Sequence, residues 1–121
     1  MKCTTRRGLL LASGIVLSWL GSLAFLLPTT PWRFHGGFLA GAVLLRTLLQ
    51  TGLFIVAHDA MHGSLWPERP RVNRWIGEAA LLLYGALPYG KCRSNHHRHH
   101  RHAGTADDPD HHGQGGESWI G

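Results

Sequence analysis

Two long apolar stretches constrain this chain more than any other feature of its sequence. Residues 8–27 carry no charged side chain, and residues 38–57 are interrupted only by Arg46 and Gln50. A helix of about 20 apolar residues is long enough to cross the hydrocarbon core of a bilayer. We therefore expect an all-α integral membrane protein whose two transmembrane helices, 8–27 and 38–57, form a hairpin.

Basic residues beside these stretches predict their orientation. Three Lys or Arg residues precede the first stretch, one lies in the connection 28–37, and three follow the second stretch before residue 75. Because cytoplasmic flanks are enriched in Lys and Arg, the amino terminus and the segment after the second stretch should both lie in the cytoplasm, with the protein in the inner membrane. A cleaved leader would also begin with basic residues. However, the first stretch is longer than a usual leader core and no A-x-A motif follows it, which favours a retained helix.

The rest of the chain is less apolar. Residues 76–88 are too short to span a bilayer, so they predict an interfacial or re-entrant helix, or one buried against other helices. Residues 91–112 are rich in His and Arg and predict a cytoplasmic helical segment. The formal charge of +5 does not indicate nucleic-acid binding, because the twelve Lys and Arg residues lie mostly beside the apolar stretches. The two cysteines are too far apart in sequence to suggest a disulfide framework or a thiolate metal site.

Two histidine motifs carry the chemistry. The first is HDAMH at 58–62, whose two histidines are four residues apart and share one face of a helix. The second is HHRHHRH at 96–102, in which the i, i+3 and i+4 histidines share a face while His97 points away. Neutral imidazole binds Zn, Fe, Cu or Ni, so the spacing does not choose the metal. The candidate ligands are His58, His62, His96, His99 and His100, with His97 and His102 as possible additional ligands.

Two other interpretations of the histidines remain open. A His-rich tract can be a loose metal-chelating tail, but such a tail requires neither the HxxHH spacing nor a second motif on a membrane helix. HDAMH also resembles the zinc-peptidase motif HExxH, with Asp59 in place of the general base. Aspartate is one methylene shorter than glutamate, and a peptidase would leave the second motif unexplained.

Carboxylates and polar residues near these motifs have candidate roles. A metal-ligating histidine commonly donates its other ring N–H to a carboxylate, which fixes its tautomer. Four aspartates are candidates for this role, although a solvated turn explains some of them equally well: Asp59, Asp107, Asp108 and Asp110. Arg46 and Gln50 are costly inside a membrane helix, so we expect them to bond to a neighbouring helix beyond this segment or to line a substrate tunnel. The sequence identifies no substrate-binding residue.

With these motifs, the chain resembles the membrane fatty acid desaturase superfamily, whose members carry three histidine boxes around two irons. More narrowly, residues 46–65 (RTLLQTGLFIVAHDAMHGSL) and 96–110 (HHRHHRHAGTADDPD) resemble the bacterial and cyanobacterial β-carotene ketolases. Carried over by position, His58 and His62 match the first box and His96, His99 and His100 match the second. The resemblance implies a di-iron fold with two iron ions, O₂ as co-substrate, a ferredoxin electron donor, and oxidation of the C4 methylene of a carotenoid ring to a ketone.

One departure from the superfamily is large. The third histidine box and the later membrane helices have no counterpart in these 121 residues. We therefore expect a fragment or a truncated gene product that lacks the C-terminal half, holds metal weakly and is inactive by itself. An acyl-lipid desaturase or hydroxylase shares the same box pattern, and a non-catalytic, membrane-anchored metal-binding protein would use the same histidines.

Overall fold

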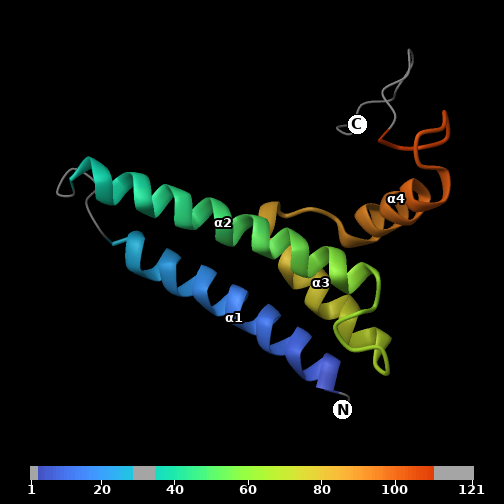
Figure 1. Ribbon diagram of the computed structural model, residues 1–121, viewed down its shortest axis with the longest axis horizontal. Helices are drawn as coiled ribbons and strands as arrows, with labels where there is room; N and C mark the ends of the chain where they lie inside the picture. The colour runs from blue at the N-terminus through green and yellow to red at the C-terminus, as the bar shows by residue number, and fades with distance from the viewer. Residues whose placement is uncertain (1–2, 29–34, 111–121) are drawn as a thin grey trace. The chain divides into compact units, whose positions relative to one another are not determined.

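Residues 3–28 and 35–110 are described by the computed structural model, and every regular element among them is a helix (Figure 1). The four helices are α1 (Cys3–Leu26), α2 (Gly36–Met61), α3 (Pro70–Gly85) and α4 (Tyr89–His102). The expectation of an all-α protein is confirmed for this part of the chain. The predicted turn at 29–34 and the tail from residue 111 onward lie outside the described residues. The chain divides into two compact units, residues 1–87 with α1–α3 and residues 88–121 with α4.

Both apolar stretches are helical, and their helices, α1 and α2, are slightly longer than the stretches themselves. Two segments, Thr5–Leu26 and Gly36–Met61, are long and apolar enough to cross a membrane. Most of their large apolar side chains are exposed, including Leu11 at 69% and Val43 at 66%. The core helix of a soluble protein buries such side chains, whereas a lipid-facing helix has no need to. The pattern of exposure therefore supports membrane association.

Helices α1 and α2 pack side by side in antiparallel directions (Figure 1). Ile15 contacts Gly52, and the contact is so close that a Cβ atom added at Gly52 would lie 2.9 Å from Ile15 Cγ2. One helical turn further along α1, the indole of Trp19 donates a 2.7 Å hydrogen bond to Gln50 Oε1. A small residue at such a crossing lets two backbones approach closely, which is a common way for membrane helices to associate.

Helix α3 also packs along α2. It begins six residues before the predicted segment 76–88. It starts at Pro70, whose fixed φ and missing N–H suit the first helical turn. It ends at Gly85 and is capped by Ala86, whose φ of 54° is left-handed, and the Leu87 amide donates back to the Leu81 carbonyl. Leu81 is fully buried in the unit formed by α1–α3. The structure shows packing of α3 against α2, and the position of this segment relative to a membrane stays a prediction.

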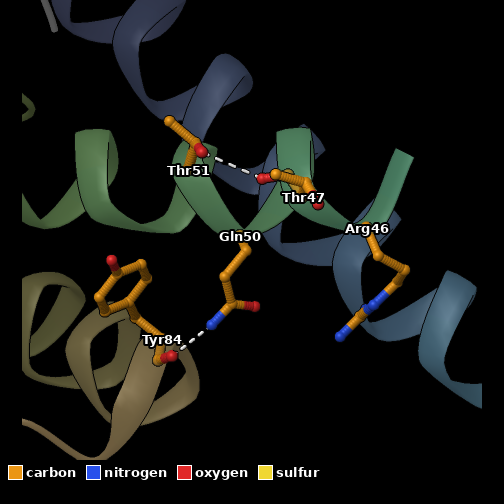
Figure 2. Close-up of a pocket in the computed structure, with 5 residues that line it drawn as sticks. All are labelled: Arg46, Thr47, Gln50, Thr51 and Tyr84. Atoms are coloured by element: carbon orange, nitrogen blue, oxygen red, sulfur yellow. Dashed lines mark hydrogen bonds between the residues drawn. The ribbon is translucent and has the colours of Figure 1, made fainter. Parts of the chain in front are cut away.

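The polar side chains inside α2 make bonds to both of its neighbours, and Figure 2 shows the one from Gln50 to Tyr84 of α3. The Arg46 Nη1 group donates to the Trp19 carbonyl at 2.9 Å and to Ser22 Oγ at 3.0 Å. The Gln50 amide donates to the Tyr84 carbonyl near the carboxyl end of α3. The sequence left two roles open for Arg46 and Gln50, a bond to a helix beyond this segment or a place in a substrate tunnel; in the described residues both side chains bond to α1 or α3. The carbonyls at a helix end need partners in an apolar environment, and the Gln50 amide satisfies one of them.

Candidate metal centre

The first histidine motif lies at the carboxyl end of α2. His58 is in the last turn of the helix, and His62 is the residue that caps it. Their ring centroids are 4.7 Å apart and the rings meet edge to face. The i, i+4 spacing of the sequence therefore produces the expected pair of imidazoles on one face of the helix.

The turn after His62 is held by a residue that the sequence did not identify. Asn73 of α3 is 3% exposed and makes three hydrogen bonds to this turn. It accepts from the Trp66 amide at 3.0 Å and donates to the carbonyls of Trp66, at 2.7 Å, and Gly63, at 3.3 Å. Asparagine is unfavourable inside a helix, so its position near the start of α3 was the available signal. Asn73 fixes the path of the backbone directly after the first motif.

The second motif forms most of α4. The rings of His96 and His100 are 4.5 Å apart and nearly perpendicular. His99 lies 5.9 Å from His100, and His97 lies 6.0 Å from His96, with distances measured between ring centroids. The pair one helical turn apart is thus brought together as predicted, within the unit that contains α4.

His99 faces two carboxylates of the turn that follows α4. Its Nδ1 lies 2.8 Å from Asp108 Oδ1 and 3.2 Å from Asp110 Oδ2. The hydrogen bond to Asp108 raises the pKa of His99 above its ordinary value. Backbone amides of Asp110 and Gly104 donate to the Asp108 carboxylate, and these bonds lower its pKa to about 2. Asp108 is therefore an ionised acceptor under ordinary conditions, and the His99 ring nitrogen facing it is the donor.

The other candidate carboxylates and histidines have weaker connections. Asp59 Oδ1 is 3.4 Å from His58 Nδ1, a poor hydrogen-bond distance between adjacent residues of a helix. Asp107 contributes its backbone carbonyl, which accepts from Arg98 Nε at 2.9 Å, while the residue itself is exposed. His102 is exposed and accepts through its carbonyl from the Thr105 hydroxyl. Of the four aspartates, Asp108 and, at a longer distance, Asp110 have the geometry that supports a histidine.

The donor atoms of both motifs fit a transition metal. Each motif offers imidazoles one turn apart on a helix, the arrangement that lets two rings grip one ion. Imidazole suits iron as well as zinc and copper, whereas magnesium and calcium prefer oxygen ligands. The His99, Asp108 and Asp110 donor atoms also lie within 4.8 Å of one another. What the fold and these side chains define is a helical protein with two apolar helices and histidine pairs suited to a metal.

The chain belongs to the fatty acid desaturase family. The family model described as "Fatty acid desaturase" matches residues 34–120, which include both histidine motifs. The chain is 44% identical over 111 residues to the β-carotene ketolase of Paracoccus sp. (strain PC1). It is 42% identical over 106 residues to the β-carotene ketolase of Paracoccus sp. (strain N81106 / MBIC 01143). At 30% identity over 94 residues it also matches the sn-1 acyl-lipid omega-3 desaturase (ferredoxin) of Synechocystis sp. (strain ATCC 27184 / PCC 6803 / Kazusa).

These alignments cover the chain and the relatives unequally. They include 92%, 88% and 78% of this chain but only 46%, 44% and 24% of the respective relatives. The chain therefore spans less than half the length of the curated relatives it matches. No solved structure matches the chain. The resemblance to the desaturase superfamily that the histidine motifs suggested is confirmed.

Proposed function

We propose that this chain is the histidine-motif portion of a membrane-bound, non-haem di-iron oxygenase, and that the enzyme is a β-carotene 4-ketolase of carotenoid biosynthesis. The observation that carries the proposal is the 44% identity to a β-carotene ketolase over 92% of the chain. The paired imidazoles at both motifs support it, because they supply the donor type that such a centre needs.

The proposal assigns the iron to five histidines from the two motifs. They are His58, His62, His96, His99 and His100. Iron can change its oxidation state, which zinc cannot, and together with O₂ it supplies an oxidant for an allylic C–H bond. In this chain α2 and α4 hold the imidazoles one turn apart, and Asn73 holds the backbone that follows His62.

The membrane arrangement is the second part of the proposal. Helices α1 and α2 form a transmembrane hairpin in the inner membrane, and both histidine motifs lie on its cytoplasmic side. The basic residues before α1 and after α2 support this orientation. A carotenoid dissolved in the bilayer could then reach the iron from the membrane, while a soluble ferredoxin-type donor could deliver electrons from the cytoplasm.

The third part of the proposal concerns what residues 1–121 can do alone, and it follows from the number of ligands. Five histidines leave two irons short of donors, and supporting residues alone change metal affinity or activity by about 10–100-fold, so missing direct ligands should cost more. We infer that residues 1–121 by themselves hold iron weakly and do not turn over. The remaining ligands would come from a partner segment that resembles the other half of the Paracoccus ketolases.

Two alternatives rest on particular observations. The match to an acyl-lipid desaturase favours an acyl chain as substrate, with desaturation or hydroxylation as the reaction. The cluster of His99, Asp108 and Asp110 favours a non-catalytic, membrane-anchored protein that binds Zn or Ni through the same residues.

Pigment analysis separates these functions. Residues 1–121 would be expressed in a β-carotene-producing host together with the C-terminal portion of a Paracoccus ketolase, because separately made membrane helices can associate. A ketolase yields echinenone or canthaxanthin with both pieces and neither product when His58→Ala is introduced. The C-terminal portion alone is the control. Altered acyl-chain unsaturation with no ketone would support the desaturase instead, and no change in either lipid class would support metal handling.

A further inference from the structure

The turn after α4 is built around one buried carboxylate. The side chain of Asp108 is 5% exposed, although it follows a helix that is almost entirely polar. Its Oδ1 atom accepts from the Asp110 amide at 2.9 Å and its Oδ2 atom accepts from the Gly104 amide at 2.9 Å. Two backbone donors therefore fix the orientation of this carboxylate independently of His99.

The fixed carboxylate determines which ring nitrogen of His99 carries a proton. Oδ1 lies 2.8 Å from His99 Nδ1, and an ionised carboxylate can only accept. A neutral His99 ring must then hold its proton on Nδ1, which leaves the Nε2 lone pair on the other edge of the ring. Asp110 adds a second acceptor at 3.2 Å from the same nitrogen. In water a neutral imidazole is free to exchange between its two tautomers, and here the turn selects one of them.

A direct metal site at the same three residues would require a different use of these atoms. A cation between His99, Asp108 and Asp110 would need the Nδ1 lone pair, so that nitrogen could no longer donate to the carboxylate. Both oxygens of Asp108 already accept backbone hydrogen bonds, which is the arrangement expected of a supporting carboxylate.

We propose that Asp108 is a positioning residue that holds His99 as the Nδ1–H tautomer and thereby presents Nε2 to a metal ion. The inference deepens the proposed function, and the statement that Nε2 binds a metal rests on that function. The statement that Asp108 selects the Nδ1–H tautomer depends only on contacts within the turn. Among the four aspartates near the motifs, the proposal selects Asp108 as the principal support and Asp110 as the secondary one.

The first measurement is the tautomer of His99, and the second is the affinity for iron. The whole chain, labelled with ¹⁵N-histidine and held in detergent micelles in alkaline buffer, gives ring nitrogen signals that distinguish the two tautomers, and His99→Gln identifies the His99 signal. We expect Nδ1–H in the native chain and a shift toward Nε2–H in Asp108→Asn. Asp107→Asn is the matched control, because Asp107 is exposed and bonds through its backbone carbonyl. It should leave the tautomer unchanged.

Asp110→Asn provides a second test of the tautomer in case Asp108→Asn does not fold. It keeps all three bonds of Asp108 and should shift the tautomer in the same direction by a smaller amount. An unchanged His99 tautomer in both Asp108→Asn and Asp110→Asn overturns the inference, and so does a native chain with its proton on Nε2. Binding of added Zn²⁺ at His99 Nδ1 would also overturn it, in favour of a direct site.

Iron binding then tests whether the tautomer held by Asp108 affects metal affinity, and it does so separately from the test of the proposed function. Competition with a chelator should show about 10–100-fold weaker iron binding in Asp108→Asn and no change in Asp107→Asn. A shifted tautomer with unchanged iron affinity would overturn the positioning role. Absence of a ketone product in the pigment assay with both pieces would count against the proposed function, whereas the tautomer measurement would still decide the inference.

Discussion

Gln50 offers the sharpest test of how the first three helices hold together. Its side chain joins α2 to both neighbours, since it accepts from the Trp19 indole and donates to the Tyr84 carbonyl. Replacing it with leucine keeps the size and removes both bonds. Hydrogen bonds between membrane helices contribute on average about 0.6 kcal/mol and at most about 1.7 kcal/mol each, so the two bonds predict a loss of about 1–3 kcal/mol.

The assay is reversible unfolding of the chain in mixed micelles titrated with a denaturing detergent and followed by circular dichroism. Thr51→Val is the matched control in the same pocket, which is about 440 Å³ in volume (Figure 2). The Thr51 hydroxyl donates to the Thr47 carbonyl of its own helix, so its removal breaks no contact between helices. We expect Thr51→Val to be nearly neutral. Equal destabilisation by both variants, or none by Gln50→Leu, would refute the reasoning.

Three further predictions follow from the packing and charges of the described residues. Gly52→Ala should destabilise the chain by about 1–3 kcal/mol in the same assay, because the new methyl group would collide with Ile15; Gly41→Ala, which meets no neighbour, should not. Asn73→Ala should cost about 1–3 kcal/mol, since it removes three part-buried hydrogen bonds to the turn, and faster amide exchange at the Trp66 N–H would confirm it. The pKa of Asp108 is lowered to about 2, so the carboxylate should stabilise the turn in moderately acidic buffer and stop doing so as the pH falls through about 2. Amide exchange at the Asp110 and Gly104 N–H groups, which donate to this carboxylate, would measure the loss. Loss of that protection near the ordinary carboxyl pKa would contradict the assignment.

Much of the fold could be predicted from residue patterns alone. The length and apolarity of 8–27 and 38–57 sufficed for the two long helices, because a bilayer requires a minimum number of apolar residues. The start of α3 at Pro70 could not be predicted as well. The six residues before Ile76 lack a continuous apolar pattern, and their helical conformation depends on a proline in the first turn and on the Asn73 bonds to the preceding loop.

In the candidate site, too, contacts within one helix could be predicted and contacts between residues far apart in sequence could not. The i, i+4 spacing of His58 and His62 determines their contact, because a helix is a local structure. The partners of Arg46 could not be predicted, since Ser22 and the Trp19 carbonyl are more than 20 residues away in sequence. The preference for Asp108 over its neighbours likewise depends on a turn that brings two backbone amides to one carboxylate.

The central proposal, which rests on the histidine motifs and the similarity to the ketolases, is that both motifs supply ligands to the same irons. Iron affinity would be measured by chelator competition for the native chain, for His58→Ala/His62→Ala, for His96→Ala/His100→Ala, and for the variant that combines all four changes. A shared centre predicts that each double variant loses most of the affinity and that the combined variant loses little more, because ligands acting as one unit are not additive. Two separate sites would instead leave one site's affinity intact in each double variant, and that result would contradict the account.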